Sequence, residues 1–323
     1  MKAVILCAGL GTRLRPVTEV WPKPAVPLLG QPLIRHSVRA LKKAGITALG
    51  INTFHLPAVM QACAEREWPG VVVSREAGEI QGTGGGVRGL RSFLNDGDFV
   101  VMNGDVLFDV DVAAVVKAHL ASKAAATMVL LPMPEGAKYN AVEIDAGHDV
   151  RRIAGKGPGG ERLTGWHFSG MHVMSPKVFD FMSASGPEDI NHDVYLRMLQ
   201  QGVRVHGHVL RERVYWSDLG TLERYTATHR DVLFGQVPGF IAEPRGAGNF
   251  WADPSASLGD VAVSGPAWFG AGAKLGRGVR VGSATSVGPG ATVGDGAHLN
   301  RCIVLDGAKV PGGQLYEDVV FFG

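Results

Sequence analysis

The stretch KAVILCAGLGTRLRP, residues 2–16, places a short apolar run directly before a glycine-rich turn that carries two arginines. A short apolar run bounded by a turn predicts a buried strand. Three further runs have this character: residues 48–52, 71–74 and 99–103. Segments with apolar residues at helical spacing alternate with them: residues 33–44, 87–94 and 112–120. This alternation predicts an α/β fold with a doubly wound, mostly parallel, Rossmann-like sheet. In such sheets the ligand binds beyond the carboxyl ends of the strands, where the turn lies.

The C-terminal segment is rich in glycine and has a period of six. Apolar residues recur at that interval: Val263, Phe269, Leu275, Val281, Val287, Val293, Leu299 and Leu305. Neither a helix nor an alternating strand keeps this period, whereas the hexapeptide coils of a parallel β-helix do. PGG at residues 311–313 is expected to break the repeat. The apolar residues 319–322 are expected to cap the open coil, to dock on the N-terminal domain or to pair with another subunit.

The change in composition divides the chain into three parts. We expect an α/β domain at residues 1–235, a linker at 236–255 and the β-helix at 256–323. The β-helix could in principle be an acyltransferase that uses coenzyme A. It contains only one histidine, His298, so we interpret it as a packing module that joins the chain into a homo-oligomer.

Composition narrows the classes of partner. The 323 residues contain 32 Lys and Arg against 30 Asp and Glu, a formal charge of +2, which gives no electrostatic reason to expect nucleic acid. No apolar run approaches the roughly 20 residues of a membrane span, so no membrane partner is expected. Cys7, Cys63 and Cys302 are odd in number and widely spaced, as expected for reduced thiols. A cytoplasmic location is therefore expected.

The first turn has the chemistry of a polyphosphate site. Gly9, Gly11 and Thr12 offer backbone N–H groups, and Arg13 adds a positive charge. Leu14 stands where a dinucleotide fingerprint would require a third glycine. Lys23, between two prolines in PKP, supplies a second cation on a stiff backbone. Taken alone, the turn could equally be a tight structural connection.

Several motifs occur together and in order. They are GLGTRLRPVT at residues 9–18, PKP at 22–24, PLLGQPLI at 27–34, NGD at 103–105, FSG at 168–170 and WSDLGT at 216–221. In this set the chain resembles the sugar-1-phosphate nucleotidyltransferases. The resemblance implies a nucleotidyltransferase domain followed by a left-handed β-helix of hexapeptide repeats. It also implies a reaction between a nucleoside triphosphate and a sugar 1-phosphate.

The resemblance assigns roles to two carboxylates and two cations. It implies that Asp105 and Asp218 hold a catalytic Mg²⁺, an ion that prefers oxygen ligands. It also implies that Arg13 and Lys23 neutralise phosphate charge during transfer. Without the other motifs, we would interpret Asp105 as a turn residue and Asp218 as a helix cap.

The substrate-binding residues also come from the resemblance. Gly82, Thr83 and Gly104 are expected at the nucleotide. At the sugar phosphate the expected residues are Asn140, Lys156, Ser169 and Gly170. Two positions depart from the family: Asn140 stands where many members have glycine, and the acid that commonly precedes Lys156 is missing.

Substrate identity stays open at this point. The stretch EIQGTGG at residues 79–85 resembles guanylyltransferases and favours GTP with a mannose-type sugar phosphate. The stretches TGGG at residues 83–86 and NGDV at residues 103–106 also resemble UTP-dependent enzymes that act on N-acetylmuramate 1-phosphate or another hexose 1-phosphate. A catalytically silent regulatory subunit that binds sugar nucleotides is the alternative from another class.

Overall fold

The structure of the chain is a computed structural model that describes residues 1–136, 139–212, 214–241 and 249–322. It separates into two compact units. The first comprises Met1–Gly11, Trp21–Ala25 and Ile34–Trp216, and the second comprises Thr12–Val20, Val26–Leu33 and Ser217–Gly323. The predicted boundary at residue 235 thus lies within the second unit. Residues 242–248 of the predicted linker lie outside the described residues.

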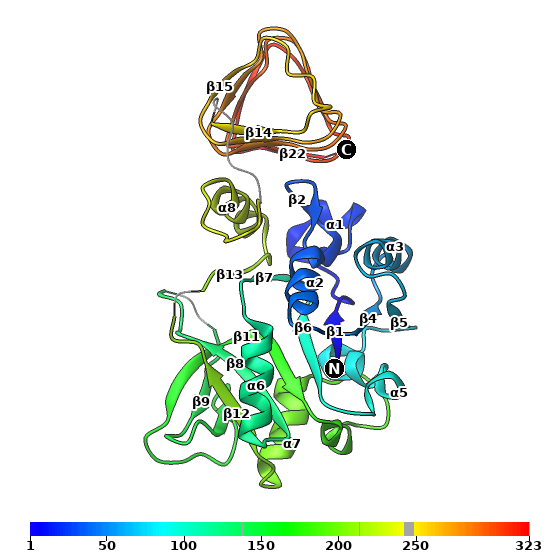
Figure 1. Cartoon of the computed structure of the whole chain (residues 1–323), viewed down its shortest axis with the longest axis vertical. Helices are drawn as coiled ribbons and strands as arrows, with labels where there is room; N and C mark the ends of the chain where they lie inside the picture. Colours follow the sequence, from blue (N-terminus) through cyan, green and yellow to red (C-terminus); the bar gives the residue numbers. More distant parts are fainter. Residues whose placement is uncertain (137–138, 213, 242–248, 323) are drawn as a thin grey trace. The chain divides into compact units, whose positions relative to one another are not determined.

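The first unit is built on one large sheet (Figure 1). Its main path runs β10 (Val150–Ile153), β9 (Val142–Ile144), β11 (Thr164–Met174), β6 (Phe99–Asn103), β1 (Lys2–Leu6), β4 (Ala48–Thr53) and β5 (Val72–Arg75). Strands β6, β1, β4 and β5 are parallel, with Ile5 level with Ile51 and Met102. Strand β11 runs antiparallel to β6 and to β8 (Ala126–Leu131), which pairs in parallel with β12 (Val205–Val209). The predicted α/β architecture is confirmed, and antiparallel pairing is confined to the half of the sheet around β11.

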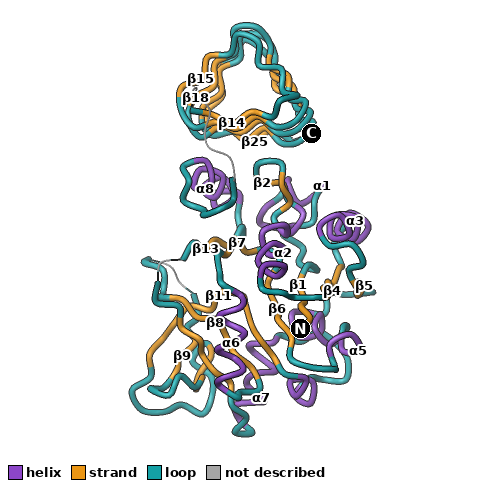
Figure 2. Tube along the Cα trace, viewed as in Figure 1, coloured by secondary structure: helices purple, strands orange, loops and turns teal. Residues whose placement is uncertain are grey.

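Helices cover both faces of this sheet (Figure 2). One buried cluster joins the sheet to α2 (Ile34–Lys43), α3 (Pro57–Glu67) and α6 (Val112–Ser122). The other joins it to α4 (Gly82–Arg88), α5 (Arg91–Leu94) and α7 (Tyr195–Gln200). Because side chains alternate along a strand, Ile5 of β1 enters the first cluster and Val4 enters the second. Burial on both faces explains why β1 and β6 are continuous apolar runs.

The second unit includes α8 (Leu222–Leu233) and short N-terminal elements: η1 (Thr12–Leu14), α1 (Val17–Val20), β2 (Pro27–Leu28) and β3 (Gln31–Pro32). Buried side chains of α8 make polar contacts inside this unit. The hydroxyl of Tyr225 donates to the carbonyl of Pro27, and His229 Nδ1 lies 3.3 Å from Ser286 Oγ. Helix α8 therefore packs with parts of the chain that are distant in sequence.

The C-terminal segment forms the predicted left-handed parallel β-helix, seen end-on as a triangle in Figure 1. The first of its three sheets holds β14 (Phe250–Ala252), β16 (Ala267–Phe269), β19 (Thr285–Val287), β22 (Ile303–Val304) and β25 (Val320–Phe321). The second holds β15 (Ala262–Ser264), β18 (Arg280–Gly282), β21 (His298–Asn300) and β24 (Leu315–Glu317). The third holds β17 (Lys274–Leu275), β20 (Thr292–Val293) and β23 (Lys309–Val310). Phe269 lies level with Val287, so a coil contains three hexads.

Two details of the predicted repeat are wrong. Val287 pairs with Val304, not Leu305, because the coil that contains Arg301 is one residue shorter, and Arg301 takes a left-handed backbone conformation (φ 53°). The PGG sequence does not end the repeat either. Strands β24 and β25 follow it, and Val320 pairs with Ile303. The apolar C-terminal residues thus supply the last strand of the β-helix.

No helix among the described residues is both long enough and apolar enough to cross a membrane.

Candidate active site

The turn after β1 presents bare backbone. A β-carbon added at Gly9 would meet no atom within 4 Å, so this segment faces open space. Gly11 has φ +62°, a conformation that glycine adopts without strain. Thr12 and Arg13 then form η1, with Arg13 exposed. The open space beside Gly9 leaves room for a phosphate to approach this backbone.

Lys23 and Asp105, which are 82 residues apart in sequence, form an ion pair. Lys23 Nζ lies 2.7 Å from Asp105 Oδ2, and the side chains are 9% and 40% exposed respectively. Gly104 positions Asp105 at the ends of β6 and β1. Its N–H donates to the carbonyl of Leu6 at 2.9 Å, and a β-carbon there would lie only 2.7 Å from that oxygen. The carboxyl ends of two parallel strands thus bring a cation and an accessible carboxylate together.

Arg13 and Asp218 come together in the second unit. A β-carbon at Gly220 would lie 3.4 Å from Arg13 Nη2 and 3.8 Å from Asp218 Oδ2. Asp218 ends β13 (Trp216–Asp218) and also forms an ion pair with Arg224 in the first turn of α8. Arg224 was not among the residues predicted from the sequence. The helix cap at Thr221, whose side chain accepts from the Arg224 N–H, is the local signal that could have found it.

The carboxylates fit a hydrated cation. Mg²⁺ usually takes one or two carboxylates and completes its shell with water and substrate phosphates. Asp105 and Asp218 offer such oxygens, each partly exposed. Within the described ranges, no group of three or more His, Cys, Asp and Glu side chains forms a protein-only metal cage. Each carboxylate, taken within its own unit, therefore suits a cation whose remaining ligands are water and substrate oxygens.

The glycine-rich segment that starts at Gly82 forms most of α4, so this helix begins five residues before the predicted start at residue 87. Gly82 has φ +69°, and a β-carbon there would lie 2.5 Å from the carbonyl oxygen of Glu188. The hydroxyl of Thr83 donates to Asp189 Oδ2 at 3.0 Å and accepts from the N–H of Ile190 at 2.8 Å. Thr83 thus uses its side chain inside the protein, and its contact with a nucleotide stays a prediction.

Two of the four predicted sugar-phosphate residues lie next to β6. Gly170 has φ +89°, and a β-carbon there would lie 3.1 Å from Asn103 Nδ2. Ser169 is buried, and its carbonyl accepts from Trp216 Nε1 at 2.8 Å. Asn140 and Lys156 are exposed, before β9 and after β10, and strand β11 separates these strands from β6.

An aromatic cluster adjoins Ser169, and the sequence analysis missed it. The ring of His167 lies 4.3 Å from that of Tyr139 and 4.4 Å from that of Trp216, centre to centre. His167 and Trp216 line a hollow of about 540 Å³, which also has Glu135 and Glu212 on its wall. Ring faces beside carboxylates suit a ligand with both apolar and hydroxyl surfaces. In the sequence, the aromatic and histidine residues along β11 and the tryptophan of the WSD motif were the features that could have predicted this cluster.

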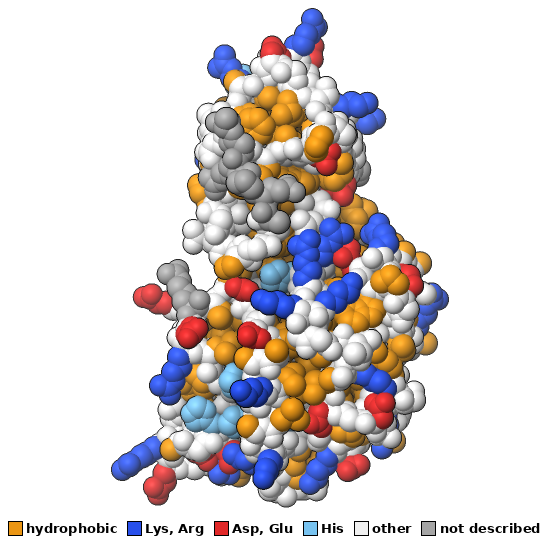
Figure 3. All heavy atoms as spheres, in the orientation of Figure 1, with side chains coloured by type: hydrophobic (Ala, Val, Ile, Leu, Met, Phe, Trp, Pro, Cys, Tyr) orange, Lys and Arg blue, Asp and Glu red, His pale blue; other side chains and the backbone are white. Residues whose placement is uncertain are grey.

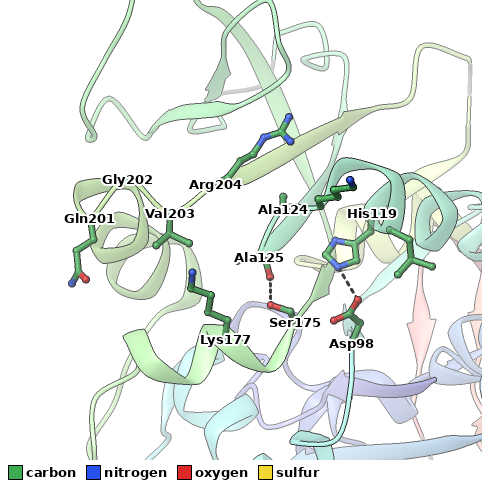
Figure 4. Close-up of a pocket in the computed structure, with 12 residues that line it drawn as sticks. Asp98, His119, Ala124, Ala125, Ser175, Lys177, Gln201, Gly202, Val203 and Arg204 are labelled. Carbon is green, nitrogen blue, oxygen red and sulfur yellow. Dashed lines mark hydrogen bonds and ion pairs between the residues drawn. The ribbon is translucent and has the colours of Figure 1, made fainter.

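A second hollow, of about 580 Å³, lies at the opposite ends of the strands (Figure 4). Asp98, Ala125 and Arg204, which line it, immediately precede β6, β8 and β12. Lys123 ends α6, and Arg204 donates to the Ser122 carbonyl in its last turn. Cations at a helix C-terminus complement its dipole, so this hollow has an ordinary structural explanation.

Similarity to known proteins identifies the family of this chain. Residues 2–234 match the family model described as nucleotidyl transferase. A UTP–glucose-1-phosphate uridylyltransferase of Synechocystis is 26% identical over 343 residues, which cover 99% of this chain and 87% of the relative. A mannose-1-phosphate guanylyltransferase of Mycobacterium tuberculosis is 29% identical, over 73% of this chain and 66% of the relative. A mannose-1-phosphate guanyltransferase of Schizosaccharomyces pombe is 30% identical, over 80% and 73% respectively. The chain belongs to the nucleotidyl transferase family.

Proposed function

We propose that this protein converts a sugar 1-phosphate and a nucleoside triphosphate into a nucleoside diphosphate sugar and pyrophosphate. The observation that carries the proposal is the Lys23–Asp105 pair at the carboxyl ends of β1 and β6, beside the open turn at Gly9. This is where a parallel sheet places its ligand. The family match to residues 2–234 covers these elements.

The reaction needs no covalent intermediate. An oxygen of the sugar phosphate attacks the α-phosphorus, and the bond from that phosphorus to the oxygen bridging the α- and β-phosphates breaks. The electron pair leaves with pyrophosphate. The barrier arises largely from bringing two anions together and from the charge that develops on the leaving group, so positioned cations supply the catalysis.

Lys23 and Arg13 are the cations that we assign to these tasks. Lys23 is nearly buried and held between prolines, so its ammonium group is pre-positioned. We assign it to the meeting of the α-phosphate and the attacking phosphate. Arg13 is exposed and follows the turn, and we assign it to the β- and γ-phosphates, whose charge grows as pyrophosphate leaves.

Asp105 and Asp218 are the residues that would hold Mg²⁺. When bound, the ion supplies charge neutralisation on the phosphate oxygens as a Lewis acid. The assignment of both to one ion comes from the family resemblance, since the two carboxylates belong to different compact units. Each has a cationic side chain beside it, Lys23 at Asp105 and Arg224 at Asp218, so a bound cation would share the carboxylate oxygens with these groups.

The remaining residues are assigned by position. Gly9, Gly11 and Thr12 would lie against the phosphates. Gly104, whose N–H is bound by the Leu6 carbonyl, would let the nucleotide approach its backbone closely, and Gly82 and Thr83 would approach the nucleoside. The sugar phosphate would meet Ser169 and Gly170 near β6, with Asn140 and Lys156 at the outer strands. The hollow beside Trp216 would hold the sugar ring.

GTP with a mannose-type sugar phosphate is the substrate pair that we favour, since the guanylyltransferase relatives share 29% and 30% identity with this chain. UTP with a hexose 1-phosphate is the second candidate, because the uridylyltransferase relative aligns with 99% of the chain, including the β-helix.

A pyrophosphate-release screen tests the proposal. Five nucleoside triphosphates would be combined with a panel of hexose 1-phosphates in the presence of Mg²⁺. We expect release that depends on both substrates, highest with GTP and mannose 1-phosphate. A UTP optimum would support the second candidate. Binding of sugar nucleotides without product in a single-turnover experiment would instead indicate a regulatory subunit.

A further inference from the structure

Two side chains connect the end of β1 to the start of α4. The N–H of Cys7 donates to Asn52 Oδ1 at 2.8 Å. Asn52 Nδ2 in turn donates to Glu76 Oε1 at 2.7 Å, and the N–H of Gln81 donates to Glu76 Oε2 at 2.7 Å. An unbroken chain of hydrogen bonds thus runs from the strand before the phosphate turn to the residue before Gly82.

The burial of Asn52 makes its hydrogen bonds energetically important. Asn52 lies at the end of β4 and is 2% exposed, and a polar group buried this deeply is costly unless its hydrogen bonds are made. Helix α4 packs directly on it. A β-carbon at Gly86 would lie 2.4 Å from Asn52 Nδ2, so glycine at this position makes room for the amide. The glycines of α4 therefore serve this contact as well as any ligand.

The opposite side of α4 is held by Glu188. Its carbonyl accepts from the N–H of Gly84 at 2.8 Å, and its own N–H donates to the carbonyl of Gln81 at 2.9 Å. Its carboxylate is buried and forms ion pairs with Arg88 and Arg197. The start of α4 is thus fixed on two sides, and Asn52 with Glu76 is the side that leads to β1.

We propose that Asn52 and Glu76 are positioning residues that fix the spacing between the phosphate turn and the nucleoside-binding start of α4. The inference rests on the proposed function, in which one nucleotide spans both segments. A pre-formed spacing reduces the cost of ordering these segments when the nucleotide binds. Loss of the connection therefore weakens nucleotide binding and leaves the sugar-phosphate side unchanged.

The direction of each hydrogen bond provides a sharp test. In Glu76→Gln, one acceptor becomes an NH₂ group that faces a donor, either Asn52 Nδ2 or the Gln81 N–H. In Asn52→Asp, a second carboxylate faces Glu76. The double variant, which combines Asn52→Asp with Glu76→Gln, restores every bond and reverses the middle one. The carboxylate now at position 52 accepts from the Cys7 N–H and from the amide now at position 76, whose oxygen accepts from the Gln81 N–H.

Steady-state kinetics on the full chain should show this pattern. We expect each single variant to raise the KM for the nucleoside triphosphate by about 10-fold, the effect of one lost hydrogen bond to a charged group. The KM for the sugar 1-phosphate should change by less than about 2-fold. The double variant should return to within about 3-fold of the wild-type value. Unchanged nucleotide KM in both single variants, or a double variant as impaired as the worse single one, overturns the proposal.

Hydrogen exchange provides a readout that does not depend on turnover. Without substrate, the amides of residues 81–86 should exchange faster in Glu76→Gln and return to the wild-type rate in the double variant. Equal rates in wild type and Glu76→Gln overturn the connection itself. An inactive wild type with the expected exchange pattern would reject the proposed function alone. If Asn52→Asp does not fold, the half-buried Glu76→Gln variant decides the question.

Discussion

Asp105 and Asp218 differ from ordinary capping residues in what surrounds them. Asp105 is held by the nearly buried Lys23, and Asp218 lies beside Gly220 together with Arg13. We expect Asp105→Asn and Asp218→Asn to fold normally and to lose turnover by on the order of 10²-fold or more, because each removes a charged metal ligand while keeping the side-chain shape.

The matched control is Asp111→Asn. Asp111 caps α6, where its side chain accepts from the N–H of Ala114 at 3.0 Å, and asparagine caps a helix equally well. This variant should keep wild-type turnover. Near-wild-type turnover in Asp105→Asn or Asp218→Asn at saturating Mg²⁺ would refute the metal assignment for that residue.

Arg13 is exposed in the turn, so its replacement removes charge without opening the core. Arg13→Ala should lower kcat by about 100-fold or more, the usual effect of deleting one group that stabilises developing charge. The KM for the sugar phosphate should stay close to wild type, and the exposed Lys43→Ala variant should be unaffected. A raised nucleotide KM with unchanged kcat would show that Arg13 only binds substrate.

At the scale of elements, β11 and α7 share a buried polar contact. His172 Nδ1 lies 2.9 Å from the Tyr195 hydroxyl, and burial lowers the pKa of His172 to about 3. Between pH 3 and the ordinary value near 6.5, the unfolded chain binds a proton here that the native state does not. The free energy of unfolding is therefore unaffected by the protonation of this histidine above about pH 6.5. Below that pH it falls, by up to about 1.4 kcal/mol per pH unit, because protons stabilise the unfolded chain.

Denaturant unfolding between about pH 7.5 and pH 4.5 measures this dependence. In the His172→Gln variant, the free energy of unfolding should depend less steeply on pH over this range, by up to the equivalent of one proton. Identical slopes for wild type and His172→Gln would contradict the predicted effect of burial.

The sequence predicted the elements whose pattern is local. The parallel strands β1 and β6 were recognisable because burial on both faces makes them continuously apolar, and the β-helix because its hexads recur every six residues, three to a coil. The start of α4 was misjudged because glycine disfavours helix, and here packing against Glu188 and Asn52 outweighs that preference. The shortened coil at Arg301 was also missed, because Val304 and Leu305 are adjacent apolar residues and either fits the pattern.

The candidate site was predictable only as separate motifs. The family resemblance pointed to Lys23 and Asp105 separately. Only the fold shows that these two residues, 82 positions apart in sequence, form an ion pair. Arg224, His167 and Asn52 carry no motif of their own. Their roles come from tertiary contacts, which local sequence patterns do not encode.

For the whole molecule, the predicted homo-oligomer still has to be tested. Apolar side chains gather on the β-helical part of the face in Figure 3, and Leu315 of β24 is 68% exposed. Removing the β-helix is a poor test, because buried residues of α8 pack within the same unit. The surface variant Leu315→Glu should lower the particle mass in sedimentation at equal concentration. A full chain that is monomeric at every accessible concentration would contradict the assembly role.

The fate of the α-phosphate tests the central claim most directly. The full chain would be incubated with Mg²⁺, a hexose 1-phosphate and a nucleoside triphosphate labelled at the α-phosphorus, and the products separated. We predict that the label moves into a nucleoside diphosphate sugar, with one pyrophosphate released per label transferred and no transfer by Asp105→Asn. Label recovered only in the triphosphate or in free nucleotide, across every base and sugar tried, would contradict the proposed function.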